Sequence, residues 1–438
     1  MQAVLSFEQA PPIAAPFRFF LTAPVFTGLA GLLLMVDGPE SLSSRWTGGA
    51  LALTHLLAVG FVLQVMLGAL VQILPVVAGA NLKRPLLVAS LVHTLFVLGA
   101  LLLVAGFLDI FPFAFPLAMT LLGTAVGFFL LAGLLSLRGV PSTSASISGF
   151  KLALASLAIV LLLGLLLAGS MAGYWAVPML LVTQLHVNWG FAAWGLGLLS
   201  AVAYVVVPMF QLTPGYPVWF SRYFGSVLTV LVLLTSLLLL WAEPEWVAVF
   251  QVVVIWLSAA FCCLTLWLQA RSKRAIPDVT QRLWRLAMIC GLLACSLWML
   301  VHLVPSLDDW PAWPILFGVL VLVGGFMSVI VGMLYKIIPF LVWLHLQNRG
   351  RGKVIAPNMK AVLGETKMKR HLQAHLATCA LLIAAVFWPE MLSRPAGLAL
   401  LVASGLLLAN LCSAIGVYRR HARLVDERLA ILAEGVEA

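Results

Sequence analysis

The chain of 438 residues is 63% hydrophobic and only 9% charged, a balance that excludes an ordinary soluble domain. Its formal net charge is +10, but the basic residues lie in short connections rather than in a soluble domain, so we expect no nucleic-acid partner. Apolar runs long enough to cross about 30 Å of hydrocarbon recur along the chain. The composition therefore predicts an integral membrane protein that is embedded in the lipid bilayer and has the lipids as its partner.

The apolar runs predict an all-α, polytopic fold with about twelve transmembrane helices. We expect a single transmembrane domain over residues 1–418, made of three four-helix pseudo-repeats at about 16–137, 147–270 and 281–418, followed by a short cytoplasmic tail over 419–438. The predicted spans are 16–36, 47–76, 84–107, 111–137, 147–172, 174–210, 217–241, 246–270, 281–304, 312–346, 372–389 and 395–418.

The loop charges predict the orientation of the spans, because Lys and Arg near span ends are retained in the cytoplasm. Connections after even-numbered spans are basic, as at Lys83 and Arg84 and over residues 349–370, whereas connections after odd-numbered spans carry acids such as Asp37 and Asp109. The alternation holds along the whole chain. It predicts that both termini lie in the cytoplasm.

Three stretches repeat one pattern, in which an apolar helix passes through a Gly-Phe step and ends at a proline. They cover residues 55–75, 186–208 and 324–339. The first two begin at a histidine, His55 and His186, and the third does not. The repetition makes these two histidines the leading candidates for a functional site.

The polar residues predicted inside the membrane favour metal or haem chemistry. No carboxylate falls near the centre of a predicted span, which weakens a proton-coupled transporter hypothesis. Imidazole and sulfur groups of the kind found here bind haem iron or copper. The predicted intramembrane polar side chains are His55, Gln64, Gln72, His93, Gln184, His186, Asn188, Tyr204, Gln251, His302 and Asn410.

The histidines differ in their expected depth. At about 1.5 Å per residue, His55, His186 and His302 fall in the outer half of the membrane and His93 falls nearer its middle. Any one of them can instead serve as an ordinary hydrogen-bonding group between helices. The remaining histidines are expected at the cytoplasmic edge or surface, without a ligand role: His345, His371, His375 and His421.

The ninth span adds a copper hypothesis. Met288, Cys295, Met299 and His302 are spaced by seven, four and three residues, which places them on one helical face. Sulfur and imidazole together suit Cu(I). We therefore consider Cys295, Met299 and His302, with His186, as metal ligands, against the alternative of a plain packing stripe.

Two segments resemble a known superfamily. Residues 184–191, Gln-Leu-His-Val-Asn-Trp-Gly-Phe, continue to Tyr204 and Pro208 and resemble the sixth helix of subunit I of C-type haem-copper oxidases and nitric oxide reductases. Residues 54–61 are similar to the low-spin haem helix of that superfamily. The resemblance implies haem b, an axial ligand at His55, and a metal or haem ligand at His186. It also implies a bacterial-type cytoplasmic (inner) membrane and a respiratory-chain or electron-transfer partner.

The departures from that superfamily are as informative as the matches. Its seventh helix carries a His-His pair for copper, but residues 219–227 contain no histidine. Its tenth helix supplies axial ligands to both haems, but residues 315–331 contain none. We therefore predict no oxygen- or NO-reducing enzyme. The opening residues 16–21, Pro-Phe-Arg-Phe-Phe-Leu, resemble the start of the NnrS family of accessory membrane proteins.

The leading hypothesis is an integral membrane protein that binds haem, with copper as a further option, and that is accessory or weakly redox-active. Its cofactor would be held by His55 and His186, with His302 or His93 as partner ligands. One alternative is a membrane transporter for a small solute or copper. Another is a structural assembly partner of a respiratory complex.

Overall fold

The computed structural model describes residues 7–241, 244–351 and 353–437; residues 1–6 of the predicted domain and Ala438 of the predicted tail lie outside the described residues. Within these ranges every regular element is a helix, and twelve helices are long and apolar enough to cross a membrane. The prediction of an all-α, twelve-span membrane protein is therefore confirmed.

The twelve spans follow one another in three sets of four. In each set, the second span is one continuous helix made of three consecutive segments. The first set consists of α1 (Ala14–Asp37), which continues into η2 (Gly38–Leu42); the second span formed by α2 (Gly48–Leu57), η3 (Ala58–Leu63) and α3 (Gln64–Ala78); α4 (Pro85–Phe107); and α5 (Ala114–Leu137). The second set consists of α6 (Ala145–Met171); the span formed by α7 (Met179–Asn188), η4 (Trp189–Leu196) and α8 (Gly197–Gln211); α9 (Val218–Trp241); and α10 (Pro244–Ala270). The third set consists of α11 (Val279–Leu303); the span formed by α13 (Trp313–Gly318), η5 (Val319–Met327) and α14 (Ser328–Arg349); α16 (Glu365–Phe387); and α17 (Pro389–Glu437). Short helices η1 (Phe7–Gln9), α12 (Pro305–Asp308) and α15 (Met359–Val362) complete the described chain.

The second, sixth and tenth spans share an unusual backbone. Each contains a π-helical segment, η3, η4 or η5, and each segment holds the Gly-Phe step of the repeated pattern. Such π turns inside α-helices are rare and frequently mark functional sites. The repeat found in the sequence is therefore also a repeat of backbone geometry.

The prolines that close the repeated pattern do not end these helices, which agrees with the predicted spans over 47–76, 174–210 and 312–346, each of which continues past its proline. Pro75, Pro208 and Pro339 lie inside α3, α8 and α14. A proline breaks a backbone hydrogen bond, but membrane helices tolerate it because neighbouring groups satisfy the freed carbonyl. The three spans therefore cross the full bundle.

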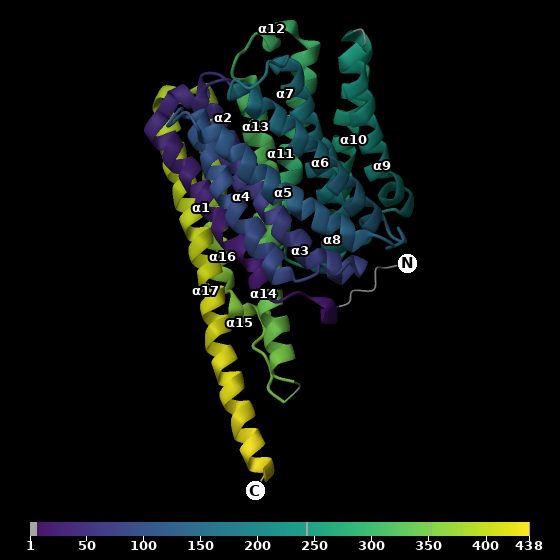
Figure 1. The fold of residues 1–438 in the computed structure, drawn as a ribbon, viewed down its shortest axis with the longest axis vertical. Helices are drawn as coiled ribbons and strands as arrows, with labels where there is room; N and C mark the ends of the chain where they lie inside the picture. The colour runs from purple at the N-terminus through teal and green to yellow at the C-terminus, as the bar shows by residue number, and fades with distance from the viewer. Residues whose placement is uncertain (1–6, 242–243, 352, 438) are drawn as a thin grey trace.

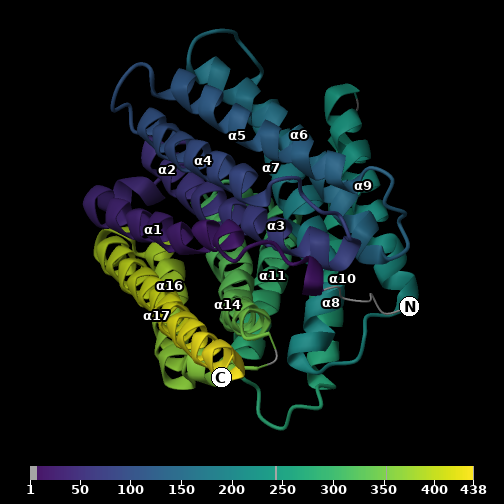
Figure 2. The ribbon, with the colours of Figure 1, turned by 60° about the horizontal axis from the view of Figure 1, so that its bottom comes forward.

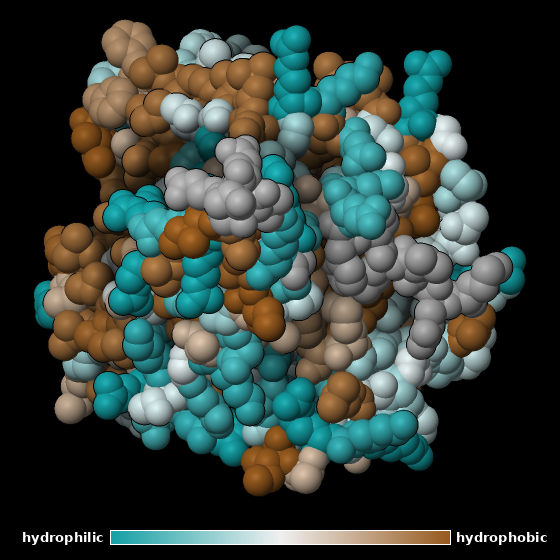
Figure 3. Space-filling model, turned by 90° about the horizontal axis from the view of Figure 1, so that it is seen from below, coloured by the Kyte–Doolittle hydropathy of each residue, from teal (hydrophilic) through white to brown (hydrophobic). Residues whose placement is uncertain are grey.

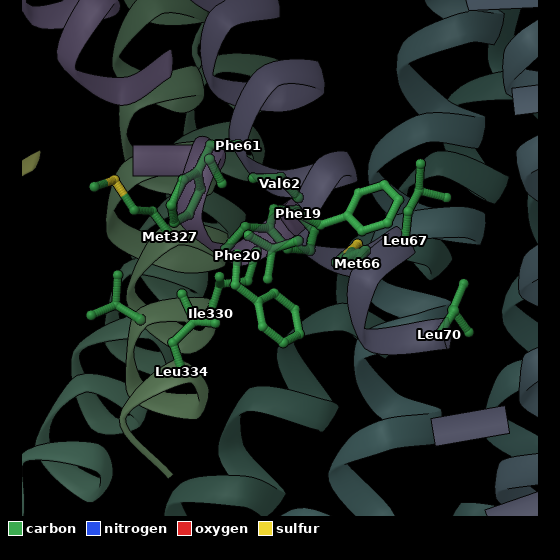
Figure 4. Packing of buried hydrophobic residues seen from close by; sticks show 14 of the residues in the cluster. Phe19, Phe20, Phe61, Val62, Met66, Leu67, Leu70, Met327, Ile330 and Leu334 are labelled. Atoms are coloured by element: carbon green, nitrogen blue, oxygen red, sulfur yellow. The ribbon is translucent and has the colours of Figure 1, made fainter. Parts of the chain in front are cut away.

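These three spans form the centre of the molecule. Of the residues in their most apolar windows, 61%, 56% and 67% are buried, against 11% for α10. η3 and η5 contact each other, and Phe61 and Val62 of η3 pack beside Phe19 of α1 and Met327 of η5 (Figure 4). The core therefore lies where the first and third sets meet at their π segments.

The last helix, α17, is one uninterrupted rod. It packs along α1 and α16 (Figure 2), and its C-terminal part projects beyond the bundle at the end opposite α12 (Figure 1). The predicted tail is thus, over its described residues, a continuation of the twelfth span. Arg349 at the end of α14 forms two hydrogen bonds of 2.7 Å to the carboxylate of Asp426, which fastens the projecting part to the bundle.

We call the end from which α17 projects the basic end. The Lys- and Arg-rich connections after the even-numbered spans lie there, and hydrophilic side chains are spread widely over this face (Figure 3). The N-terminal segment reaches the same end, because Nε2 of His345 in α14 lies 3.1 Å from the carbonyl oxygen of Pro11. Both ends of the described chain therefore share one side of the bundle.

Candidate functional site

A cavity of about 610 Å³ lies between the second, sixth, eighth, ninth and tenth spans. Its walls include residues of both η4 and η5, so two of the three π segments shape it. Ligand sites in proteins typically have volumes of about 300–1,000 Å³ and mostly apolar walls with a few polar groups. The cavity has the size and lining of a small-molecule site.

Several of the polar groups that line the cavity are amides and hydroxyls. They include Thr54 of α2, Thr183, Gln184 and Asn188 of α7, and Gln251 of α10. Gln184 and Asn188 flank His186 in the segment that resembles the oxidase helix. These uncharged groups suit a neutral ligand or the polar edge of a larger apolar one.

Arg45 is the charged side chain among the residues that line the cavity. It precedes α2, and its guanidinium carbon lies 4.7 Å from the ring centre of Trp46, which also lines the cavity. Arg45 therefore supplies a positive charge at the end of the cavity away from the basic end.

His302 is the one predicted histidine ligand that lines the cavity. Its Nδ1 lies 2.8 Å from the carbonyl oxygen of Trp298, and its ring stacks on that indole at 3.8 Å and meets Trp313 edge-on. When Nδ1–H is donated to a backbone carbonyl, Nε2 keeps the lone pair that coordinates a metal. His302 is thus held in an orientation suited to a ligand.

Part of the helical face of the ninth span that carries the predicted sulfur and imidazole ligands lines the cavity. Met288 and Cys295 line the cavity with His302, whereas Met299 is not among the lining residues. Within the described residues, no three His, Cys, Asp or Glu side chains gather closely enough to hold a metal ion. A copper set of Cys295, Met299, His302 and His186 stays a prediction.

His55 and His186 form a pair beside the cavity rather than in its wall. Nδ1 of His55 lies 2.8 Å from the carbonyl oxygen of Leu51, and its ring packs against Phe107. His186 packs against Gly164 of α6, and its Nδ1 is buried without a hydrogen-bond partner. The two imidazoles are close enough to interact electrostatically. The structure therefore brings together the histidines that begin the first two repeats.

His93 belongs to a different cluster. Its Nε2 lies 2.8 Å from the hydroxyl of Thr22, which also accepts a hydrogen bond from the amide of Gln64. Gln64 is nine residues after His55 in the second span, a separation of about 14 Å along the helix. The structure thus places His93 away from His55, in a hydrogen-bonded contact between α1, α3 and α4.

The expectation that His371 and His375 lie at the surface is wrong. Both are 0% exposed, because α16 begins at Glu365 and carries them into the bundle. The missed signal is their spacing of four residues, continued by Cys379, which repeats one helical face while Lys369 lies on an exposed one.

The fold defines an integral multi-pass membrane protein, and the cavity between five of its spans has the size of a ligand site. No protein-family model and no curated protein matches the chain. The cavity and the side chains around it therefore carry the information about function in this chain.

Proposed function

We propose that this protein is a membrane haem-binding protein in which the haem occupies the cavity and His302 supplies an axial ligand. The observation that carries the proposal is an apolar cavity of 610 Å³ with an imidazole in its wall whose Nδ1 is already engaged by a backbone carbonyl. A b-type haem requires an apolar slot and an axial nitrogen, without covalent attachment.

Two further residues support the fit of a haem. Arg45 can form charge-assisted hydrogen bonds with a propionate at the charged end of the cavity, and Phe326 of η5 offers an aromatic wall for the macrocycle. A bound haem would supply a one-electron redox centre. On this proposal the protein exchanges electrons with a respiratory-chain or other electron-transfer partner.

The His55–His186 pair is the competing position for the iron. Nδ1 of His55 is engaged by Leu51 in the same way as Nδ1 of His302 is engaged by Trp298, so His55 also presents Nε2. The pair does not line the cavity, so a haem in the cavity would lie against His302 and not against His55 or His186. We therefore assign the first axial ligand to His302.

An optical spectrum of protein purified from haem-replete cells tests this proposal, recorded oxidised and after reduction with dithionite. We expect a Soret band in the parent, its loss or a marked shift in His302→Ala, and its retention in the double variant His55→Ala/His186→Ala. His345→Ala is the matched control, since the ring nitrogens of His345 lie 2.9 and 3.1 Å from backbone carbonyl oxygens near the basic end, away from the cavity.

Two results would count against the proposal. Loss of the band only in the double variant would move the iron to the His55–His186 pair. A parent without any Soret band would exclude haem and leave the cavity to another ligand.

The uncharged polar lining favours a second candidate, binding and transport of a small neutral solute. Thr54, Gln184, Asn188 and Gln251 come from three different spans, so a solute bound by them would be sensitive to movement of those spans. Uptake into proteoliposomes by the parent, reduced in Gln184→Leu, would support this candidate. Absence of uptake together with a Soret band would leave the haem proposal standing alone.

A further inference from the structure

Three buried glutamines meet near the basic end, outside the cavity. Gln211 is the last residue of α8, Gln269 lies at the end of α10 and Gln281 lies in the first turn of α11, and each is at most 2% exposed. Nε2 of Gln269 donates a hydrogen bond of 2.8 Å to Oε1 of Gln211, and Nε2 of Gln281 donates one of 3.3 Å to the carbonyl oxygen of Gln269. We call these three residues the inner amide cluster. It joins the ends of the sixth, eighth and ninth spans.

The hydrogen bonds of the inner amide cluster are incomplete. Nε2 of Gln211, Oε1 of Gln269 and Oε1 of Gln281 are buried without a partner among the described residues. The same holds for Nε of Arg274, whose guanidinium also donates a hydrogen bond of 3.2 Å to the carbonyl oxygen of Phe210, next to the cluster. Buried polar groups nearly always have a partner in the protein or in ordered water. The four atoms therefore mark a place that binds a hydrogen-bonding ligand.

The four atoms require a ligand that both donates and accepts hydrogen bonds. Nε2 of Gln211 and Nε of Arg274 are donors, whereas the two free Oε1 atoms are acceptors. A cation would meet the charge of Arg274, and an anion would meet the carboxylate of Asp278, which lies 3.5 Å from Arg274. Water is neutral, and a buried water typically makes about three hydrogen bonds to otherwise unpaired groups. The cluster therefore has the chemistry of a water-binding site.

Two further buried atoms lie between the cluster and the cavity. Nε1 of Trp284, three residues after Gln281 in α11, has no partner in the part of the chain that the structure describes. The same is true of the hydroxyl of Tyr204, seven residues before Gln211 in α8. Met288, which lines the cavity, is seven residues after Gln281, a rise of about 10 Å along the helix. Polar atoms without partners thus follow the helices from the basic end towards the cavity.

We propose that the inner amide cluster binds water molecules that continue past Trp284 and Tyr204 and connect the basic end with the cavity. Water in this position gives each free amide, indole and hydroxyl group a partner, which the surrounding apolar side chains do not offer. The water also gives the cavity an aqueous connection to the basic end. This connection forms whichever ligand the cavity holds.

Radiolytic footprinting of the full chain in detergent tests the proposal. Short X-ray pulses convert water to hydroxyl radicals, which oxidise side chains beside bound water even where bulk solvent does not reach, and mass spectrometry identifies the oxidised residues. Trp189 is the matched control within the molecule, because it is also buried but donates its indole N–H to the hydroxyl of Ser236 at 2.9 Å. We expect Trp284, which is 0% exposed, to be oxidised faster than Trp189.

The triple variant Gln211→Leu/Gln269→Leu/Gln281→Leu should lose the oxidation of Trp284 and Tyr204. The variant removes every amide of the cluster at once, so no glutamine is left with a missing partner. Its apolar side chains offer nothing to hold water at the basic end, so the path to the cavity should be dry.

Gln72→Leu is the matched control variant. Oε1 of Gln72 is also buried without a partner among the described residues, but it lies in α3, so Trp284 should be oxidised as in the parent. Oxidation of Trp284 no faster than that of Trp189 in the parent would overturn the proposal, and this comparison needs no variant. Undiminished oxidation of Trp284 in the triple variant would also overturn it, because water would then reach the indole without the cluster.

Discussion

At the scale of single residues, Asp278 joins two helices at the basic end. One carboxylate oxygen accepts a hydrogen bond from the backbone N–H of Gln281 at 2.9 Å and so caps α11. The other accepts one from Nζ of Lys336 in α14 at 2.7 Å, with Arg274 3.5 Å away. The same side chain therefore caps the first turn of the ninth span and forms an ion pair with Lys336 of the tenth span.

Two substitutions at Asp278 separate the contribution of the helix cap to stability from that of the ion pair with Lys336. Asp278→Asn keeps an oxygen for the cap but removes the charge, and we expect it to lower the free energy of unfolding by about 0.5–1 kcal/mol. Asp278→Ala also removes the cap, which adds about 1 kcal/mol. Thermal unfolding in detergent measures both.

Glu365→Gln is the control for Asp278, because it breaks an ion pair whose side chains are 63% and 55% exposed and should leave the midpoint unchanged. Equal midpoints for the asparagine and alanine variants of Asp278 would show that the cap contributes nothing.

At the scale of helices, α1 and α17 approach through two glycines. A Cβ atom added at Gly31 would meet the carbonyl oxygen of Gly397 and the backbone nitrogen of Leu401, each at 2.6 Å. Small residues at such crossings let membrane helices pack by van der Waals contact of their backbones. The first and last spans therefore pack against each other through this contact, which completes the bundle.

Gly31→Ala should consequently destabilise the protein. The added methyl meets backbone rather than a flexible side chain, so we expect a loss of about 1–3 kcal/mol, measured as a lower unfolding midpoint in detergent. Gly405→Ala on α17 is the matched control: nothing lies within 4 Å of its Cβ, so higher helix propensity should leave stability unchanged or raised. Similar midpoints for the two variants would mean that the helices separate at little cost.

The sequence predicts the presence of the twelve transmembrane helices better than it predicts the π segments inside them or the residues at which they begin. Long apolar runs identify all twelve spans, because length and composition suffice for a helix in lipid. The π segments escape prediction because residues such as those of η4, Trp189–Leu196, are apolar throughout, so an inserted residue shifts no visible pattern. The sequence also fails to predict that α16 begins at Glu365, because Lys367, Lys369 and Arg370 have the composition of a loop. This error placed His371 at the surface.

At the scale of the whole molecule, the basic end fixes the orientation that we expect in the membrane. Positive charges are retained in the cytoplasm, and the projecting part of α17 lies at the basic end (Figure 1). A fluorescent protein fused after Ala438 should therefore fluoresce in the cytoplasm. Alkaline phosphatase fused after Asp109, between α4 and α5, should be active on the outside. The reverse pair of results would invert the topology.

Which side chains converge on the cavity could be predicted only in part. The spacing placed Met288, Cys295, Met299 and His302 on one face, and all of these except Met299 line the cavity. The repeated pattern singled out His55 and His186, but it did not reveal that neither of them lines the cavity. The rotation of each helix about its axis is set by packing against its neighbours, as where Gly164 receives the ring of His186, and spacing along one helix does not reveal it.

The matching positions of the three π segments are most simply explained by the copying of one four-helix unit. A π turn corresponds to one extra residue in an α-helix, and here it occurs in the second helix of each set of four. Three separate insertions at the same step are a less economical history than one insertion in an ancestral four-helix unit that was then copied. On that account the π turn is older than the present molecule. The histidine that opens the first two copies but not the third was gained or lost after the copying.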